Sequence, residues 1–129
     1  MQTDVSIIAK TLYGEARSEG YEGILAVATV IFNRAKGDRD MFAKVCLKPK
    51  QFSCWTGVDD IEIKEKKPWK ICDKIAQSMW NNTFKPYEFK IKPTNYLTYA
   101  LYNSEKCPNW ARGVSGVVVG KHIFLQLKN

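Results

Sequence analysis

A helical stripe near the N-terminus constrains the fold of this chain more than any other feature. Apolar residues recur there at helical spacing, and two glutamates continue the same stripe; its members are Ile8, Leu12, Glu15, Ala16 and Glu19. Loss of solvent at the margin of an apolar face favours the protonated form of a carboxyl group, which can then donate a proton. The stripe therefore predicts a buried helix with acid/base capacity near its C-terminal end.

Glu15 is the better candidate for proton transfer. It follows Gly14, whose missing side chain leaves room for a ligand, whereas Glu19 lies just before Gly20, where we expect the helix to end. Two glutamates with Arg17 between them also fit an ordinary solvated helix face. The spacing by itself leaves both interpretations open.

Helical periodicity along the whole chain predicts three long helices. Thr3 or Asp4 can cap a first helix that runs to about Ser18, and a second helix is expected over about residues 21–35. Pro68 can open a third helix, whose apolar face is expected to be core.

A β-hairpin is predicted at the C-terminal end. Residues 114–119 and 122–127 have the composition of strands and are joined by a short turn at Gly120-Lys121. The chain has 129 residues, 45% of them hydrophobic, which suits one core. We expect residues 1–129 to form a single α+β domain, mostly helical, with a small C-terminal antiparallel sheet.

The charge balance points to anionic partners without choosing among them. Twenty basic and thirteen acidic residues give a net charge of +7. Such a surface attracts nucleic acid, anionic membranes or an anionic bacterial envelope, with a strength that falls as salt rises. The basic residues are scattered, with modest clusters at Lys44, Lys48 and Lys50 and at residues 64–70, so a merely soluble surface is an equal alternative.

Cysteine spacing argues against a metal site. Cys46, Cys54, Cys72 and Cys107 form no CxxC pair, and His122 is the only histidine. Four cysteines permit two disulfides, but we expect free thiols, because the chain is long enough to fold without cross-links and has no visible export signal. A Cys54/His122 nucleophilic pair is a remote alternative. Phosphate-binding glycine loops are missing as well, so we expect no cofactor.

Three blocks of the sequence carry a family resemblance. The segment Tyr13-Gly14-Glu15-Ala16-Arg17-x-Glu19-Gly20, with the small and apolar pattern of residues 23–34, resembles the catalytic domain of the SleB/CwlJ family of bacterial cell-wall hydrolases, the spore-cortex-lytic type. Gln51-Phe52-Ser53-Cys54-Trp55 is similar to the second signature of that family. Trp110 and residues 119–124 are similar to its C-terminal strand. The blocks cover most of residues 7–55 and 99–124.

The chain departs from the family pattern in three places. Ser18 stands where the family more often has glycine, and residues 92–96 resemble an Asp-Pro-Thr-x-Gly segment only loosely. Residues 56–68 match nothing in the family pattern. We expect that charged segment to be solvated surface.

The resemblance implies a lysozyme-like or lytic-transglycosylase-like fold and a peptidoglycan glycosidase. Glu15 would be the single acid/base at the bond between N-acetylmuramic acid and N-acetylglucosamine. If the carboxylate then takes its proton from the muramoyl 6-hydroxyl, the product is a 1,6-anhydro sugar; if from water, the enzyme is a muramidase. Trp110 is expected to be a further groove residue. We expect substrate-binding or supporting roles for Tyr13, Glu19, Gln51, Phe52, Ser53, Trp55, Tyr102 and His122.

Three of those expectations carry their own alternatives. Glu19 is one helical turn from Glu15 and does not suit the opposite side of a sugar ring, so we expect it to bind Arg17 or a backbone group. Tyr13 is equally well explained as a buried aromatic, and His122 fits a structural histidine at the rim of a site.

A non-enzymatic module that binds glycan or nucleic acid is the competing hypothesis. It predicts a dispensable Glu15 and a basic face away from that residue, whereas glycan cleavage predicts a cleft lined by Glu15, Phe52 and Trp55. An amidase would need a metal or an activated nucleophile. The expected partners are peptidoglycan and anionic envelope polymers, with no specific nucleic acid, no membrane insertion and a monomeric state.

The N-terminus bears on where the protein is made. Met1-Gln2-Thr3-Asp4-Val5 does not look like a signal peptide, and the longest apolar run is too short to span a bilayer. We expect synthesis in the cytoplasm, the host cytoplasm for a phage endolysin, and action on the bacterial wall. A bacterial enzyme stripped of its leader would have the same sequence features.

Overall fold

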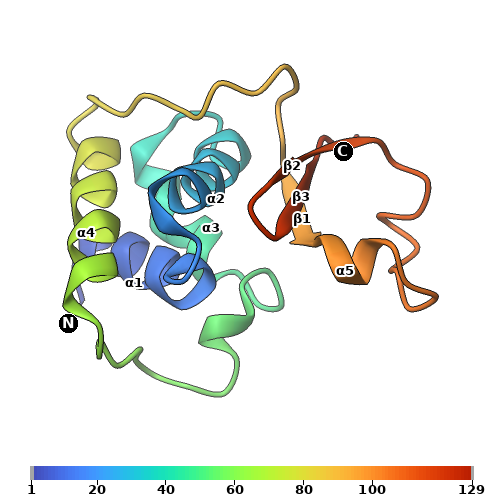
Figure 1. Cartoon of the computed structure of the whole chain (residues 1–129). Helices are drawn as coiled ribbons and strands as arrows, with labels where there is room; N and C mark the ends of the chain where they lie inside the picture. Colours follow the sequence, from blue (N-terminus) through green and yellow to red (C-terminus); the bar gives the residue numbers. More distant parts are fainter. Residues whose placement is uncertain (1, 129) are drawn as a thin grey trace.

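A computed structural model describes residues 2–128. A helical part contains α1 (Asp4–Ala16), α2 (Gly20–Arg34), α3 (Phe42–Leu47) and α4 (Lys66–Trp80). Two short 3-10 turns, η1 (Arg39–Met41) and η2 (Ser53–Trp55), flank α3. A smaller part follows, built from a three-stranded sheet and the one-turn helix α5 (Tyr99–Tyr102), and it lies beside the helices (Figure 1).

Local sequence explains where α1 begins and which face it buries. The Thr3 hydroxyl caps the helix by accepting the Ser6 N–H, as the sequence predicted for Thr3 or Asp4. Ile8, Leu12 and Ala16 form the buried stripe, each no more than 1% exposed. The helix ends at Ala16, two residues before the expected Ser18.

The second helix is the centre of the core. It begins at Gly20, where a positive φ of 75° lets the chain turn sharply out of α1. Its apolar residues are buried on nearly every side of the helix; they include Ile24, Val27, Val30 and Ile31. Burial of each large apolar side chain stabilises the fold by roughly 1.5–3 kcal/mol. Both α1 and α4 pack against α2.

Two buried threonines attach loops to the helices. The Thr11 hydroxyl donates to the Ile7 carbonyl and accepts the indole N–H of Trp55, which fixes η2 on α1. The Thr29 hydroxyl donates to the Leu25 carbonyl and accepts the Tyr87 N–H. That second contact fixes the long connection that crosses the helices between α4 and the sheet (Figure 1).

The sheet has the strand order β1-β3-β2, and both pairings are antiparallel. The expected hairpin is present as β2 (Gly116–Val119) and β3 (His122–Leu125), each shorter than predicted. The first strand, β1 (Asn95–Thr98), was not predicted, and it pairs Tyr96 with Phe124. The fold is α+β and mostly helical, as expected.

The segment before α4 is more than the solvated surface that the sequence predicted. Ile61 and Ile63 are half-buried and pack against the helical core. The Tyr13 hydroxyl accepts the backbone N–H groups of Lys64 and Glu65. Charged side chains dominate its composition, but the two isoleucines and these backbone contacts make it a cover for α1.

All four cysteines are free thiols in the structure, as expected. Within residues 2–128, no helix has both the length and the apolar character needed to cross a membrane.

Candidate active site

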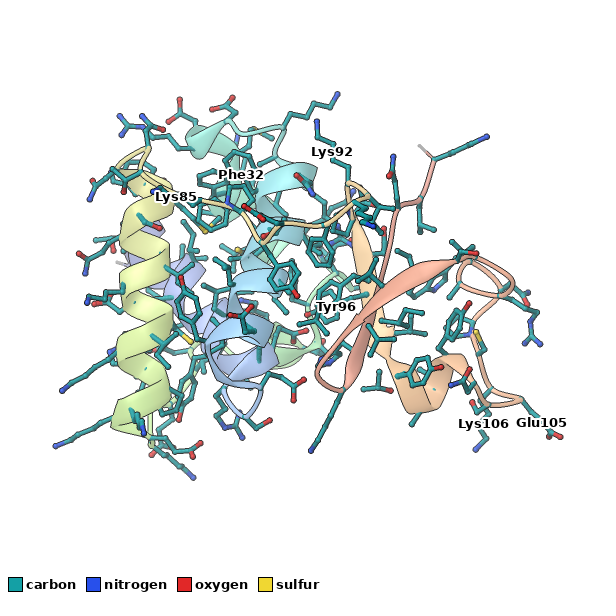
Figure 2. The ribbon with its side chains drawn as sticks, turned by 45° about the horizontal axis from the view of Figure 1, so that its top comes forward. Phe32, Lys85, Lys92, Tyr96, Glu105 and Lys106 are labelled. Atoms are coloured by element: carbon teal, nitrogen blue, oxygen red, sulfur yellow. The ribbon has the colours of Figure 1, made fainter. Side chains whose placement is uncertain are left out.

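A cleft of about 740 Å³ opens between the helical part and the sheet. Its helical wall comes from the C-terminal end of α1, the end of α2 and the loop before η2; the opposite wall comes from β1, β3, α5 and the loop after α5. In Figure 2 Tyr96 lies between the helices and the sheet, while Glu105 and Lys106 lie at the far end of the sheet part. Glu15 and Tyr96 meet from opposite walls.

Hydrogen bonds to both of its oxygens hold the Glu15 carboxyl group. The Tyr96 hydroxyl donates to Oε1 at 2.5 Å, and the Cys54 backbone N–H donates to Oε2 at 3.1 Å. The Ser53 hydroxyl lies 3.4 Å from the same Oε2. Since a carboxylate has about four lone-pair positions, these donors fix the group and still leave a position free to hold a proton.

Tyr96 is buried in a way that keeps its hydroxyl a donor. Its ring packs edge-on against His122 at 5.3 Å and beside Phe124 at 5.4 Å. Burial and the adjacent charge of Glu15 raise the pKa of Tyr96 well above its ordinary value of 10.0. The phenol therefore stays protonated throughout the neutral range.

Gly14 has a different use from the one expected. The sequence predicted open space for a ligand, but a Cβ at this position would lie 2.5 Å from the Cβ of Cys54. The missing side chain lets η2 approach α1 closely, and this approach places the Cys54 N–H on Glu15.

Cys54 itself is a poor nucleophile. Burial and the charge of Glu15 raise the pKa of its thiol far above the ordinary value of 9.0. Its sulfur lies 3.9 Å from the Thr11 carbonyl. His122 has its own carboxylate partner, Glu19, so a Cys54/His122 pair gains no support from the geometry.

Glu19 joins the end of α1 to the hairpin. Its side chain is only 5% exposed, and Oε1 accepts the Lys121 N–H at 3.0 Å and lies 3.2 Å from His122 Nδ1. Gly120, at the hairpin turn, leaves room for this carboxylate. Arg17 pairs with Glu65 instead, at 3.1 Å. Of the two partners expected for Glu19, the structure provides the backbone group.

The structure divides the other predicted site residues into two groups. Gln51, Ser53 and His122 line the cleft with Glu15, and so does Trp110. The remaining four lie outside its lining, as their own contacts show. Tyr13 and Phe52 are buried in the helical core, Trp55 donates to Thr11, and Tyr102 stacks on Tyr99 and donates to the Val114 carbonyl.

Sequence reasoning missed several cleft residues, of which Tyr96 contacts Glu15 directly. It missed Arg34 as well, although Asn33 was expected to bond a neighbouring loop and does donate to the Pro93 carbonyl. Arg34 donates to the Thr94 carbonyl at 2.6 Å and stacks over the Phe52 ring. Burial lowers its pKa from the ordinary 12.5. Tyr96 and Thr98 are residue types that favour strands, and this composition was the available local signal.

The chain matches the Cell Wall Hydrolase family over residues 18–125. It is 43% identical to a spore cortex-lytic enzyme of Oceanobacillus iheyensis over 54 residues, which are 40% of this chain and 20% of that enzyme. It is also 55% identical to the spore cortex-lytic enzyme of Bacillus subtilis over 31 residues, 24% of this chain and 10% of the enzyme. The matched segments thus span a fifth or less of these relatives.

Two solved structures share the fold. The catalytic domain of the germination-specific lytic transglycosylase SleB from Bacillus anthracis superposes with a TM-score of 0.69 at 23% identity, over 98% of this chain and 96% of that one. The catalytic domain of the Bacillus cereus SleB protein gives a TM-score of 0.67 at 24% identity, over 95% and 89%. Together with the family match, which spans most of the sequence, these findings show that the chain belongs to the Cell Wall Hydrolase family.

Proposed function

We propose that this protein cleaves the glycan strands of peptidoglycan as a lytic transglycosylase, with Glu15 as its only acid/base. One observation carries the choice of reaction: among the residues that line the described cleft, Glu15 is the single carboxylate. Glycosidases that use a nucleophile or an activated water ordinarily need a second carboxylate across the sugar ring. Glu19 does not fill that place, because the hairpin holds its side chain outside the cleft lining.

The reaction needs one group that first gives and then takes a proton. Protonated Glu15 donates to the glycosidic oxygen as the bond from this oxygen to C1 of the muramic acid breaks and positive charge develops at C1. The resulting carboxylate accepts the proton of the muramoyl 6-hydroxyl while O6 bonds to C1. The products are a 1,6-anhydromuramoyl end and a free N-acetylglucosamine hydroxyl, and Glu15 returns to its protonated state.

Other side chains have roles that follow from sugar chemistry. Tyr96 and the Cys54 N–H orient the Glu15 carboxyl group. Trp110 lines the sheet wall with an exposed aromatic face, which suits the apolar side of a pyranose ring. Gln51 and Asn95 supply amides that suit N-acetyl and hydroxyl groups.

The relatives support the substrate class. The curated ones are named as spore cortex-lytic enzymes, and one of the solved neighbours is described as a lytic transglycosylase. The family name describes action on a cell wall.

Product analysis tests the proposal. Purified peptidoglycan is digested with wild-type protein and with Glu15→Gln, and the fragments are identified by mass spectrometry. We expect anhydromuramic ends from the wild type and almost none from the variant. Reducing muramic ends would indicate a muramidase, reducing glucosamine ends a glucosaminidase, and free stem peptides an amidase; any of these as the main product overturns the proposal.

A further inference from the structure

A second groove lies next to the catalytic cleft. It has a volume of about 580 Å³ and lies between α3, the end of α2 and the C-terminal segment. Arg34, Gln51, Asn95 and Leu127 line both spaces, so the groove and the cleft are immediate neighbours. Its volume is in the range of about 300–1,000 Å³ that is common for small-molecule sites.

The charge of this groove differs from that of the cleft. Its lining has five basic residues and no acidic one: Arg34, Lys36, Lys44, Lys48 and Lys128. None of these side chains belongs to an ion pair among residues 2–128, whereas Lys10, Arg17 and Lys64 each have an acidic partner elsewhere. The positive charge of the groove is therefore not neutralised within the described chain.

The sugar strand alone does not complement this charge. N-acetylated sugars are neutral, and the lactyl carboxyl group of muramic acid is consumed in the amide bond to the stem peptide. The carboxylates of a peptide-bearing strand lie on the stem, which branches from C3 of the muramic acid whose C1–O bond Glu15 would cleave. Gln51 and Asn95 line both spaces, so a stem that leaves the cleft on their side would meet the basic groove.

We infer that this groove is a binding site for the carboxylates of the stem peptide, so that the protein prefers glycan strands bearing anionic stems. The inference rests on the proposed function and adds a specificity determinant to it. Single exposed lysines contribute little to binding, but several uncompensated ones around one groove act together on a ligand with more than one carboxylate.

The experiment compares two forms of one substrate. Soluble uncross-linked strands that carry peptide stems are prepared with free carboxylates and with the same carboxylates converted to primary amides. We expect wild-type kcat/KM to be about tenfold higher on the free form, the scale of a few partly screened ion pairs. In Lys44→Gln/Lys48→Gln this ratio should fall to near one.

A matched variant controls for net charge. Lys70→Gln/Lys74→Gln also removes two lysines, from the exposed face of α4 away from both spaces, and should keep the wild-type ratio. Equal ratios in wild type and Lys44→Gln/Lys48→Gln, or the same drop in the α4 variant, would overturn the inference.

Binding measurements separate this inference from the proposed function. Titration of both strand forms into Glu15→Gln, with and without Lys44→Gln/Lys48→Gln, reads the groove without any turnover. Preferential binding of the free form that depends on the two lysines supports the groove even if wild type cleaves neither form, an outcome that would reject the proposed function alone. Lysine-dependent binding of duplex DNA with no preference between the strand forms would reject the groove as a stem site and assign it to nucleic acid.

Discussion

The two parts of the molecule contribute unequally to the site. The helical part has the large core and carries both glutamates, whereas the sheet part has a separate small cluster of five buried residues. Yet each glutamate is completed from the sheet part, Glu15 by Tyr96 and Glu19 by the hairpin around Lys121 and His122. The helical part thus supplies the proposed acid/base, and the docking of the smaller part helps to orient it.

The largest effect is expected from removing the contribution of the helical part. Glu15→Gln keeps the shape of the side chain but removes the acid, and we expect glycan cleavage to fall at least about a hundredfold, the scale of a lost general acid. Turnover of purified glycan strands measures the loss. Thermal unfolding and wall sedimentation serve as controls, since both should stay near wild type. Near-normal turnover by the folded variant would remove Glu15 from the mechanism.

Removing the contribution of the sheet part should have a smaller effect on the same step. Tyr96→Phe keeps the ring between His122 and Phe124 but deletes the hydrogen bond to Glu15, and hydrogen bonds to charged groups contribute about 1.5–3 kcal/mol. We expect kcat to fall roughly tenfold to a hundredfold with little change in KM, and the pH profile of kcat to move.

Tyr87→Phe is the matched control for that variant. Tyr87 also packs on a phenylalanine, Phe89, at 4.6 Å, and its hydroxyl makes no hydrogen bond to any residue that the structure describes. This control should keep the wild-type kcat and pH profile. If Tyr96→Phe behaves like Tyr87→Phe, the sheet part does not orient the acid.

The contact of Glu19 with the hairpin forms a joint between the two parts, and straining this joint should lower stability. Gly120 has φ of 61°, and an added Cβ would lie 2.7 Å from Glu19 Oε1, so Gly120→Ala must displace a nearly buried carboxylate from the hairpin. Gly113→Ala has the same backbone penalty at φ of 76° but meets open space. We expect Gly120→Ala to lose about 1–3 kcal/mol more than Gly113→Ala in urea unfolding. Equal losses would show that the Glu19 contact does not stabilise the joint.

The helical core should also respond to alkaline pH. Burial raises the pKa of Cys46 and of Cys72 to about 12, from an ordinary value of 9.0. Above pH 9 the unfolded chain therefore releases thiol protons that the folded chain keeps, so the free energy of unfolding falls as pH rises, by up to about 1.4 kcal/mol per pH unit for each thiol. Below pH 9 these thiols have no such effect.

Urea unfolding at pH 8, 9 and 10 measures this slope. Cys46→Ala/Cys72→Ala should show a shallower decline, whatever its stability at pH 8, because two of the titrating groups are gone. The same slope in both proteins would mean that these thiols ionise as readily when folded as when unfolded.

The helical part was easier to predict from the sequence than the sheet part. The helices were predicted because apolar periodicity is local, and the hairpin because its turn joins neighbouring strands. The strand β1 was missed because it has four residues and pairs with a strand far along the chain. A four-residue segment gives too little alternation to be recognised without its partner.

The site residues were predictable only where a local sequence pattern indicates that a side chain faces the cleft. Glu15 was found from its stripe and from the family resemblance, whereas Tyr96 is 81 positions away in sequence, and no local pattern connects the two. Phe52 and Trp55 were chosen as aromatic residues beside a signature, but the fold uses them in packing. Aromatic residues serve cores as readily as sugar sites, so only the tertiary structure distinguishes Trp110 from Phe52.

Isotope labelling tests the central claim, that Glu15 works alone and the muramoyl 6-hydroxyl is the nucleophile. Peptidoglycan is digested by the wild-type protein in water enriched in ¹⁸O, and the new muramic ends are analysed by mass spectrometry. We expect anhydromuramic ends that carry no ¹⁸O, because no water enters the bond-breaking step. Reducing muramic ends labelled with ¹⁸O would show that water is the nucleophile and would contradict this claim.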